Sequence, residues 1–158
     1  MAQPIPEIDV LIGVAKWLQA NGWDIYVISP PHGQGIGTIS DLRAKMVQSG
    51  VSLTGVKIQP HGEDIRAKLC EIVWKIECKG LGEGEKATDK NNFDRAIASA
   101  VSYLTQEDLR IGLALPEYFE GLLRKKLPQA LRMKTNLWVF LYVNADEVYL
   151  FYPEDELP

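Results

Sequence analysis

Hydrophobic and polar residues follow two different periods along this chain, and the two periods predict helices and strands in a definite order. Apolar side chains recur at helical spacing over 8–18, after Pro6, and Asn21-Gly22 ends this first helix. The other elements are predicted in the same way: helices over 40–50, 93–104 and 116–127, and strands over 23–29, 55–59, 64–68, 72–80, 109–115, 137–143 and 148–153. This order indicates an α/β fold in which a central mixed β-sheet is flanked by helices.

The stretch 73–80, VWKIECKG, has the clearest alternation. Trp74, Ile76 and Cys78 occupy every second position, and charged residues stand between them. Successive side chains of a strand point to opposite faces, so one face is predicted to be buried and the other to carry charge. The preceding strand, 64–68, is close enough in sequence to pair with this one as a hairpin. The hairpin would give the charged face a second row of side chains.

Length and composition fit a single domain spanning 1–158, with an acidic tail, 153–158, that is expected to fray. The formal net charge of −4 excludes a protein that holds nucleic acid by bulk positive charge, although a local basic groove stays open. Cys70 and Cys78 have no partners at zinc-site spacing, and free thiols suit a reducing compartment. No signal peptide and no apolar run of about 18 residues is found, so a cytoplasmic protein without a membrane association is expected.

A glycine-rich loop, HGQGIG, follows the strand at 23–29 and precedes a helix. Its spacing is Gly-x-Gly-x-Gly rather than a dinucleotide or P-loop fingerprint, and Pro30 and Pro31 remove two backbone donors nearby. A plain turn is the main interpretation, and a nucleotide-binding loop is the alternative.

Candidate chemistry lies on the charged face of the predicted hairpin. Strand pairing can bring Asp64 beside Glu77, because neighbouring strands lie about 4.8 Å apart. Two carboxylates this close repel each other, and a divalent cation such as Mg²⁺ would relieve the repulsion. Lys79 projects from the same face as Glu77, where its ammonium could hold a water or stabilise charge on a phosphate. The three residues together form a plausible site for phosphodiester hydrolysis.

Here the chain resembles the PD-(D/E)xK nuclease superfamily, the restriction-endonuclease-like fold. The resemblance rests on GEDIRA, where the family has Pro-Asp and a short strand, and on WKIECKG, where it has a strand ending in Glu-x-Lys-Gly. It implies that Asp64, Glu77 and the backbone carbonyl of Cys78 bind Mg²⁺ or Mn²⁺, that Lys79 is the catalytic lysine, and that Glu7 adds a ligand as in some branches.

Three departures from the family pattern stand beside these motifs. Glu63 occupies the place of the proline before Asp64. Ser99 precedes Tyr103 where several branches have Gln, so the role of that Gln would be missing or taken by Arg95 or Asn92. An ion pair between Arg66 and Glu77 would silence the site.

The resemblance implies a metal-dependent nuclease, an endonuclease that hydrolyses phosphodiester bonds in DNA. Arg95, Lys125 and Lys126 are the candidate contacts to nucleic acid, since phosphate binding needs clustered cations. The alternative is a catalytically inactive, nuclease-like binding protein or partner subunit, in which the charged strand face is only solvated. A second copy of the chain or a partner subunit is the other partner to consider.

Overall fold

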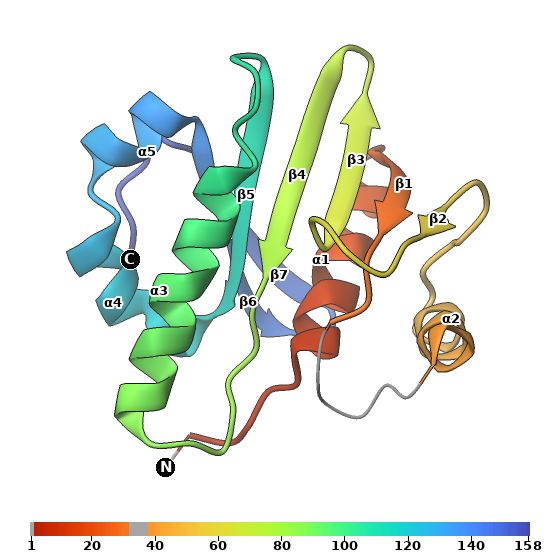
Figure 1. Cartoon of the computed structure of the whole chain (residues 1–158), viewed down its shortest axis with the longest axis horizontal. Helices are drawn as coiled ribbons and strands as arrows, with labels where there is room; N and C mark the ends of the chain where they lie inside the picture. The colour runs from red at the N-terminus through yellow and green to blue at the C-terminus, as the bar shows by residue number, and fades with distance from the viewer. Residues whose placement is uncertain (1, 32–37) are drawn as a thin grey trace.

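A computed structural model describes residues 2–31 and 38–158 of the chain, whose strands form one mixed sheet between helices (Figure 1). The helices are α1 (Glu7–Ala20), α2 (Ile39–Gln48), α3 (Lys86–Ser102), the 3-10 turn η1 (Glu117–Phe119), α4 (Glu120–Lys126) and α5 (Gln129–Thr135). The strands are β1 (Asp24–Ile28), β2 (Lys57–Ile58), β3 (Ile65–Leu69), β4 (Ile72–Cys78), β5 (Leu109–Pro116), β6 (Leu137–Asn144) and β7 (Glu147–Phe151). The predicted α/β class is therefore confirmed.

The seven-stranded sheet has the order β2-β1-β3-β4-β5-β6-β7. Strands β4, β5 and β6 run parallel to one another, and β2 runs parallel to β1. Both predicted hairpins, β3–β4 and β6–β7, are present as antiparallel pairs. The crossover from β4 to β5 is made by α3, which is the connection that parallel neighbours require.

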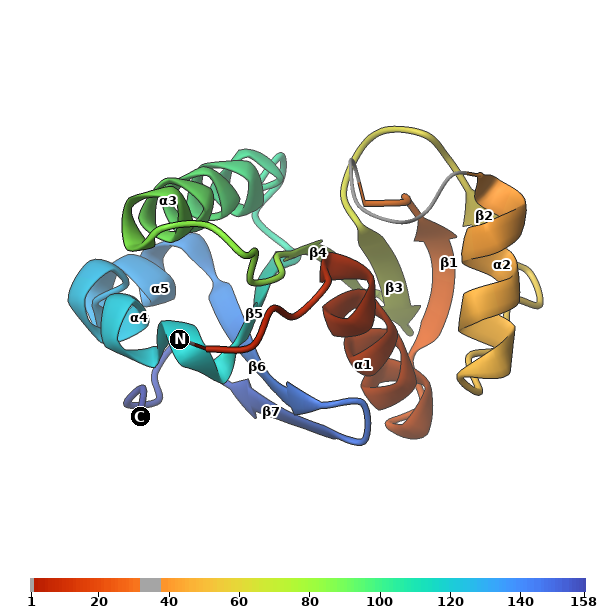
Figure 2. The same cartoon turned by 90° about the horizontal axis from the view of Figure 1, so that it is seen from below.

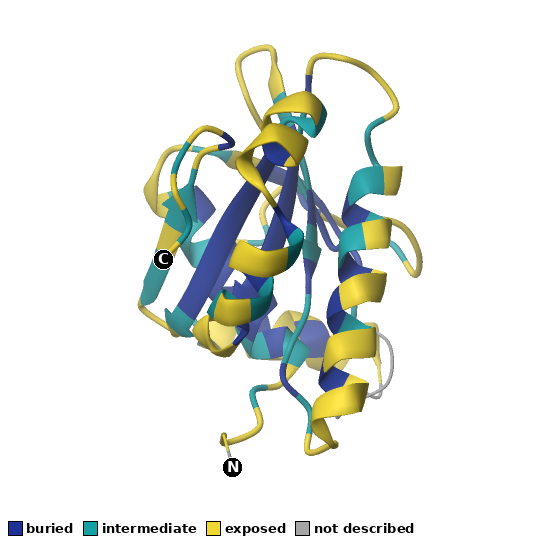
Figure 3. Ribbon diagram, turned by 90° about the vertical axis from the view of Figure 1, so that its left-hand side faces the viewer, coloured by how far each residue is buried: buried dark blue, intermediate teal, exposed yellow. Residues whose placement is uncertain are grey.

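Helices cover the two faces of the sheet unequally (Figure 2). Helix α1 lies on one face and is buried along almost its whole length, because the β6–β7 hairpin also packs against it. Helices α3 and α4 pack on the other face, over β5 and β6, through a second cluster that includes Phe93, Leu123 and Val139. Their outward sides are exposed and their inward sides buried (Figure 3). No helix in the described part of the chain is long and apolar enough to cross a membrane.

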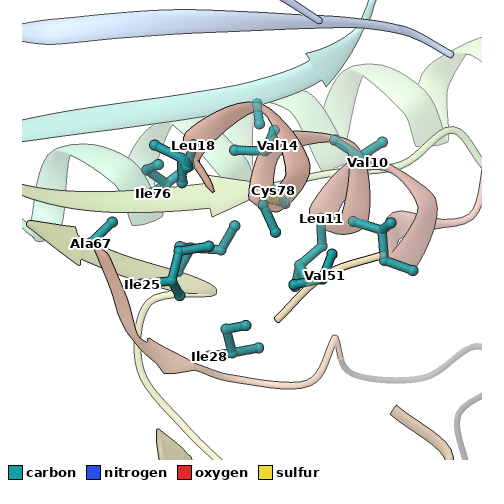
Figure 4. Close-up of a cluster of buried hydrophobic side chains, with 14 of the residues drawn as sticks. Val10, Leu11, Val14, Leu18, Ile25, Ile28, Val51, Ala67, Ile76 and Cys78 are labelled. Atoms are coloured by element: carbon teal, nitrogen blue, oxygen red, sulfur yellow. The ribbon is translucent and has the colours of Figure 1, made fainter. Parts of the chain in front are cut away.

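The alternation predicted for β4 is observed. Trp74, Ile76 and Cys78 are fully buried on the α1 side, where Cys78 and Ile76 lie against Val14 and Leu18 of the helix (Figure 4). The residues between them stay partly exposed on the opposite face. The strand ends at Cys78 instead of continuing to Gly80, and this places Lys79 just outside the sheet.

Two helical segments differ from the sequence-based prediction. Helix α3 begins at Lys86, seven residues before the predicted start. Its first two turns were not predicted because they are polar and carry no apolar periodicity. Helix α5 was not predicted, and it contributes a buried arginine instead of a buried apolar stripe.

The C-terminal segment 153–158, expected to fray, is held against the molecule. Arg132 donates hydrogen bonds to the carbonyls of Tyr152 and Asp155, at 2.9 and 2.6 Å. Leu157 packs against the cluster beneath α3 and α4. The glycine-rich loop HGQGIG, at 32–37, lies outside the described residues.

Candidate active site

The register of the β3–β4 hairpin brings Asp64 and Glu77 to one face. Ile65 pairs with Ile76, and the Asp64 N–H donates to the Ile76 carbonyl at 3.1 Å, so Asp64 lies across from Glu77. Residues directly opposite in an antiparallel pair project to the same side. The negative charge of Glu77 accordingly raises the pKa of Asp64. The two residues therefore share one face of the hairpin, as the sequence predicts.

Asp64 is hydrogen-bonded and almost entirely removed from water. It is 8% exposed, and its Oδ2 accepts a hydrogen bond of 2.7 Å from the Cys78 N–H. Burial is the largest cause that raises its pKa well above the usual range, followed by the charge of Glu77, while the Cys78 hydrogen bond acts in the opposite direction. A buried carboxyl beside a second acid favours the neutral form unless a cation is nearby.

The N-terminal segment brings a third acid to the site. Ile5 and Leu81 exchange two backbone hydrogen bonds, both 2.8 Å long, just before α1 begins. The segment crosses directly over Gly80, where an added Cβ would lie 2.3 Å from the Ile5 carbonyl oxygen and 2.5 Å from the Glu7 nitrogen. This close passage sets Glu7 beside Lys79, and Lys79 Nζ lies 2.8 Å from Glu7 Oε2.

Tyr103, at the C-terminal end of α3, completes the surroundings of Glu77. Its hydroxyl donates a hydrogen bond to Glu77 Oε2. Burial raises the pKa of Glu77, the Tyr103 hydrogen bond and the charge of Lys79 lower it, and the charge of Glu7 raises it. The same burial and hydrogen bond raise the pKa of Tyr103, so its hydroxyl acts as a donor. In the sequence, Tyr103 stands out only by its spacing from Ser99.

Glu7, Asp64 and Glu77 are referred to below as the acidic cluster. Their three carboxylates lie near the ammonium of Lys79 at a site that is partly buried from water. Hard oxygen donors with excess negative charge are the kind of ligands that Mg²⁺ takes, so the donor set suits that ion. Among residues 2–31 and 38–158, no group of three His, Cys, Asp or Glu residues is arranged to hold a metal ion. Glu77 and Glu7 are instead oriented toward Tyr103 and Lys79.

Arg66 does not silence the site in the way that the sequence suggested. It forms an ion pair with Glu63, the residue that replaces the family's proline, and Glu63 is itself buried. Glu77 stays free of Arg66 and turns to Tyr103. Glu63 therefore has a structural reason for its position, since it neutralises the arginine next to the acidic cluster.

The remaining predicted residues lie outside the acidic cluster or contribute to it indirectly. The Cys78 thiol is buried on the α1 side, and burial raises its pKa, so only the backbone of Cys78 faces the site. Its carbonyl stays a predicted metal ligand. Arg95 and Lys125 are exposed on α3 and α4, and Lys126 forms an ion pair with Asp94.

Tyr103→Phe tests how Glu77 is held. Losing one hydrogen bond to a charged, partly buried group is expected to cost about 1.5 kcal/mol of folding stability. Because that hydrogen bond lowers the pKa of Glu77, the variant should protonate Glu77 at higher pH than the wild type. NMR titration of the Glu77 side chain measures this, and an unchanged titration would show that the hydroxyl does not hold the carboxylate. Tyr118→Phe, at an exposed ring on η1, is the matched control.

Comparison of the chain with protein-family models, with curated proteins and with solved structures gave no match. The resemblance to the PD-(D/E)xK superfamily therefore rests on the residues described above.

Proposed function

We propose that the protein is a metal-dependent nuclease that hydrolyses phosphodiester bonds in DNA, with the acidic cluster and Lys79 as its active site. The observation that supports this most strongly is the meeting of Asp64 and Glu77 on one face of the hairpin, with Lys79 beside them. Two carboxylates and a lysine on adjacent strands form a site suited to binding a cation and a phosphate together.

Each residue has a role that its surroundings support. Asp64 and Glu77 would hold Mg²⁺ or Mn²⁺ with the Cys78 carbonyl, and Glu7 would contribute once released from Lys79. When bound, the metal would supply neutralisation of phosphate charge and activation of a water. Lys79, freed from Glu7, would stabilise negative charge that develops on the phosphate. The Cys78 N–H fixes one oxygen of Asp64 and leaves the other available.

A second candidate function is a catalytically inactive, nuclease-like binding protein or partner subunit. It is favoured by the ion pair of 2.8 Å between Lys79 and Glu7, which occupies the catalytic lysine. In such a protein, Lys79 and Glu7 would simply balance charge at the end of β4. The two candidates differ in whether a divalent metal and a phosphate displace this ion pair.

A cleavage assay with Mg²⁺ or Mn²⁺, on plasmid and single-stranded DNA, tests the proposed activity. Lys79→Ala is expected to lower the cleavage rate by roughly 10²–10³-fold, the loss typical of removing one group that stabilises transition-state charge. The matched control is Lys45→Ala, because Lys45 also pairs with an acid in the first turn of α1, at 3.1 Å from Asp9.

Equal cleavage rates for Lys79→Ala and the wild type would contradict the assignment of Lys79. Wild-type protein that binds the metal but cleaves none of these substrates would favour the second candidate function.

A further inference from the structure

Within residues 2–31 and 38–158, no helix covers the face of strands β1 and β3 that lies beside the acidic cluster. In the hairpin register, Arg66 pairs with Lys75 and Lys68 pairs with Val73, so these side chains share the face of Glu77. Helix α3 packs on β4 and β5 and does not extend over β3 or β1, which face the viewer in Figure 1 with no helix in front of them. Lys68 is exposed, and Arg66 and Lys75 are half-buried.

An aromatic side chain lies among these cations. The pairing of β1 with β3 is irregular between Ile25 and Val27, and Tyr26 occupies the irregular position. The guanidinium carbon of Arg66 lies 5.9 Å from the centroid of the Tyr26 ring, and the Lys68 Nζ lies 5.5 Å from it. Both cations are therefore within cation–π range of this half-buried ring. Tyr26, Arg66, Lys68 and Lys75 are called the cationic strip below.

The carboxylates near the cationic strip do not neutralise all of its positive charges. Glu63 neutralises Arg66 through their ion pair, and Asp24 stands opposite Lys68 in the register. Within the described residues, however, neither Lys68 nor Lys75 comes within ion-pairing distance of a carboxylate. Other lysines of the chain do find acids; they are Lys16, Lys45, Lys79 and Lys126. Two ammonium groups on the open face are thus left for an external anion.

We propose that the cationic strip binds single-stranded DNA and leads it to the acidic cluster. Lys68 and Lys75 contact successive phosphates, and a base stacks on Tyr26, since an aromatic ring flanked by cations is the combination used for single-strand binding. Lys75 stands two residues before Glu77 on β4, about 7 Å away along the strand, so the same backbone reaches the acids. A duplex keeps its bases stacked and offers none to Tyr26. This inference rests on the proposed function and names its substrate.

The contacts differ from those that the sequence suggested. Lys126 is engaged by Asp94, and Arg95 and Lys125 lie on the outer helices α3 and α4. The cationic strip instead follows the strands that carry Asp64 and Glu77. It is assembled by strand pairing, and no run of basic residues marks it in the sequence.

Fluorescence anisotropy of a labelled oligothymidine in EDTA tests the strip without any cleavage. Tyr26→Ala is expected to weaken binding about tenfold, because a base loses the aromatic ring on which it stacks. Tyr26→Phe keeps the ring and should bind like the wild type, which separates stacking from folding. Lys68→Ala and Lys75→Ala should each reduce the slope of log Kd against log salt by about 0.7. Arg43→Ala, at an exposed site on α2, is the control and should change neither quantity.

Unchanged affinity in Tyr26→Ala, or tighter wild-type binding to a hairpin duplex than to oligothymidine, would overturn the proposal. The result also separates the strip from the proposed activity. If oligothymidine binding depends on Tyr26 but the protein never cleaves DNA, the cationic strip is supported and the proposed nuclease activity is contradicted. If the protein cleaves DNA with a metal but binds oligothymidine equally well without the Tyr26 ring, the cationic strip is contradicted and the nuclease activity is supported.

Discussion

Asp64→Asn is expected to abolish metal-dependent cleavage and at the same time to stabilise the metal-free protein. The asparagine keeps an oxygen that can accept the Cys78 N–H, and it removes a negative charge from beside Glu77 and Glu7. Cleavage should fall by at least about 10²-fold, as when other groups that stabilise transition-state charge are removed. Opposite effects of one substitution on activity and stability are typical of a site whose charges serve a ligand.

The stabilisation has a defined pH dependence. The folded protein raises the pKa of Asp64 above its ordinary value of 3.8, chiefly through burial, and the pKa of Glu77 is raised as well. A group with a raised folded pKa contributes stability at low pH and loses that contribution as pH rises through the folded pKa. The metal-free wild type should therefore lose stability as pH increases above about 4. Asp64→Asn should lose less.

Thermal unfolding in EDTA, from acidic to neutral pH, measures this difference. In a domain of this size, a rise of roughly 3 °C in Tm corresponds to about 1 kcal/mol. Asp94→Asn is the control, because it removes an exposed carboxylate that pairs with Lys126 and should change stability by less than about 1 kcal/mol. A metal-free Asp64→Asn protein less stable than the wild type at neutral pH would contradict the expected repulsion.

Gly80→Ala is expected to cause the largest loss of stability among single methyl additions near the site. Its new Cβ would lie 2.3 Å from the Ile5 carbonyl oxygen, which is backbone and cannot rotate away. Overpacking of this kind costs about 1–3 kcal/mol. The N-terminal segment would have to move outward, which breaks the hydrogen bonds between Ile5 and Leu81 and separates Glu7 from Lys79.

Chemical denaturation measures the lost stability, and hydrogen exchange at the Ile5 and Leu81 amides reports the displaced segment. Gly82→Ala is the matched control two residues later, because its Cβ would meet nothing closer than 3.9 Å. If Gly80→Ala keeps both amides protected and unfolds at the same denaturant concentration as the wild type, the segment does not need this glycine.

The fold follows from apolar periodicity where that periodicity is strong. In this way the helix α1 was predicted from positions 8–18, and the buried Trp74, Ile76 and Cys78 of β4 were predicted individually. The start of α3 was missed because Lys86–Asn92 is polar and only Asp89 is buried there. Helix α5 was missed for a similar reason, since its anchor is Arg132, whose guanidinium donates to the backbone carbonyls of Leu127, Tyr152 and Asp155. Polar anchors leave no periodic signal.

The candidate site, too, has contacts that the sequence predicted and contacts that it did not. Asp64 and Glu77 could be predicted to meet because a short hairpin fixes the register of its strands. The Glu7–Lys79 pair depends on a crossing over Gly80 that joins segments more than 70 residues apart, and no local pattern encodes it. The sequence left an ion pair between Arg66 and Glu77 open, and Arg66 pairs with the nearby Glu63 instead, since strand pairing alone does not choose between the two acids. Contacts between single polar side chains that are far apart in the sequence could be identified only from the folded structure.

Calorimetric titration of Mn²⁺ or Mg²⁺ into the wild type and Glu77→Gln tests the central claim most directly, namely that the acidic cluster is a metal site. The substitution keeps the shape of the side chain and an oxygen that Tyr103 can bond, and it removes the charge. We predict a single binding event in the wild type that releases protons, since the pKa values of Asp64 and Glu77 are raised, and its loss in Glu77→Gln. Absence of binding in the wild type, or equal affinity in the two proteins, would contradict the account.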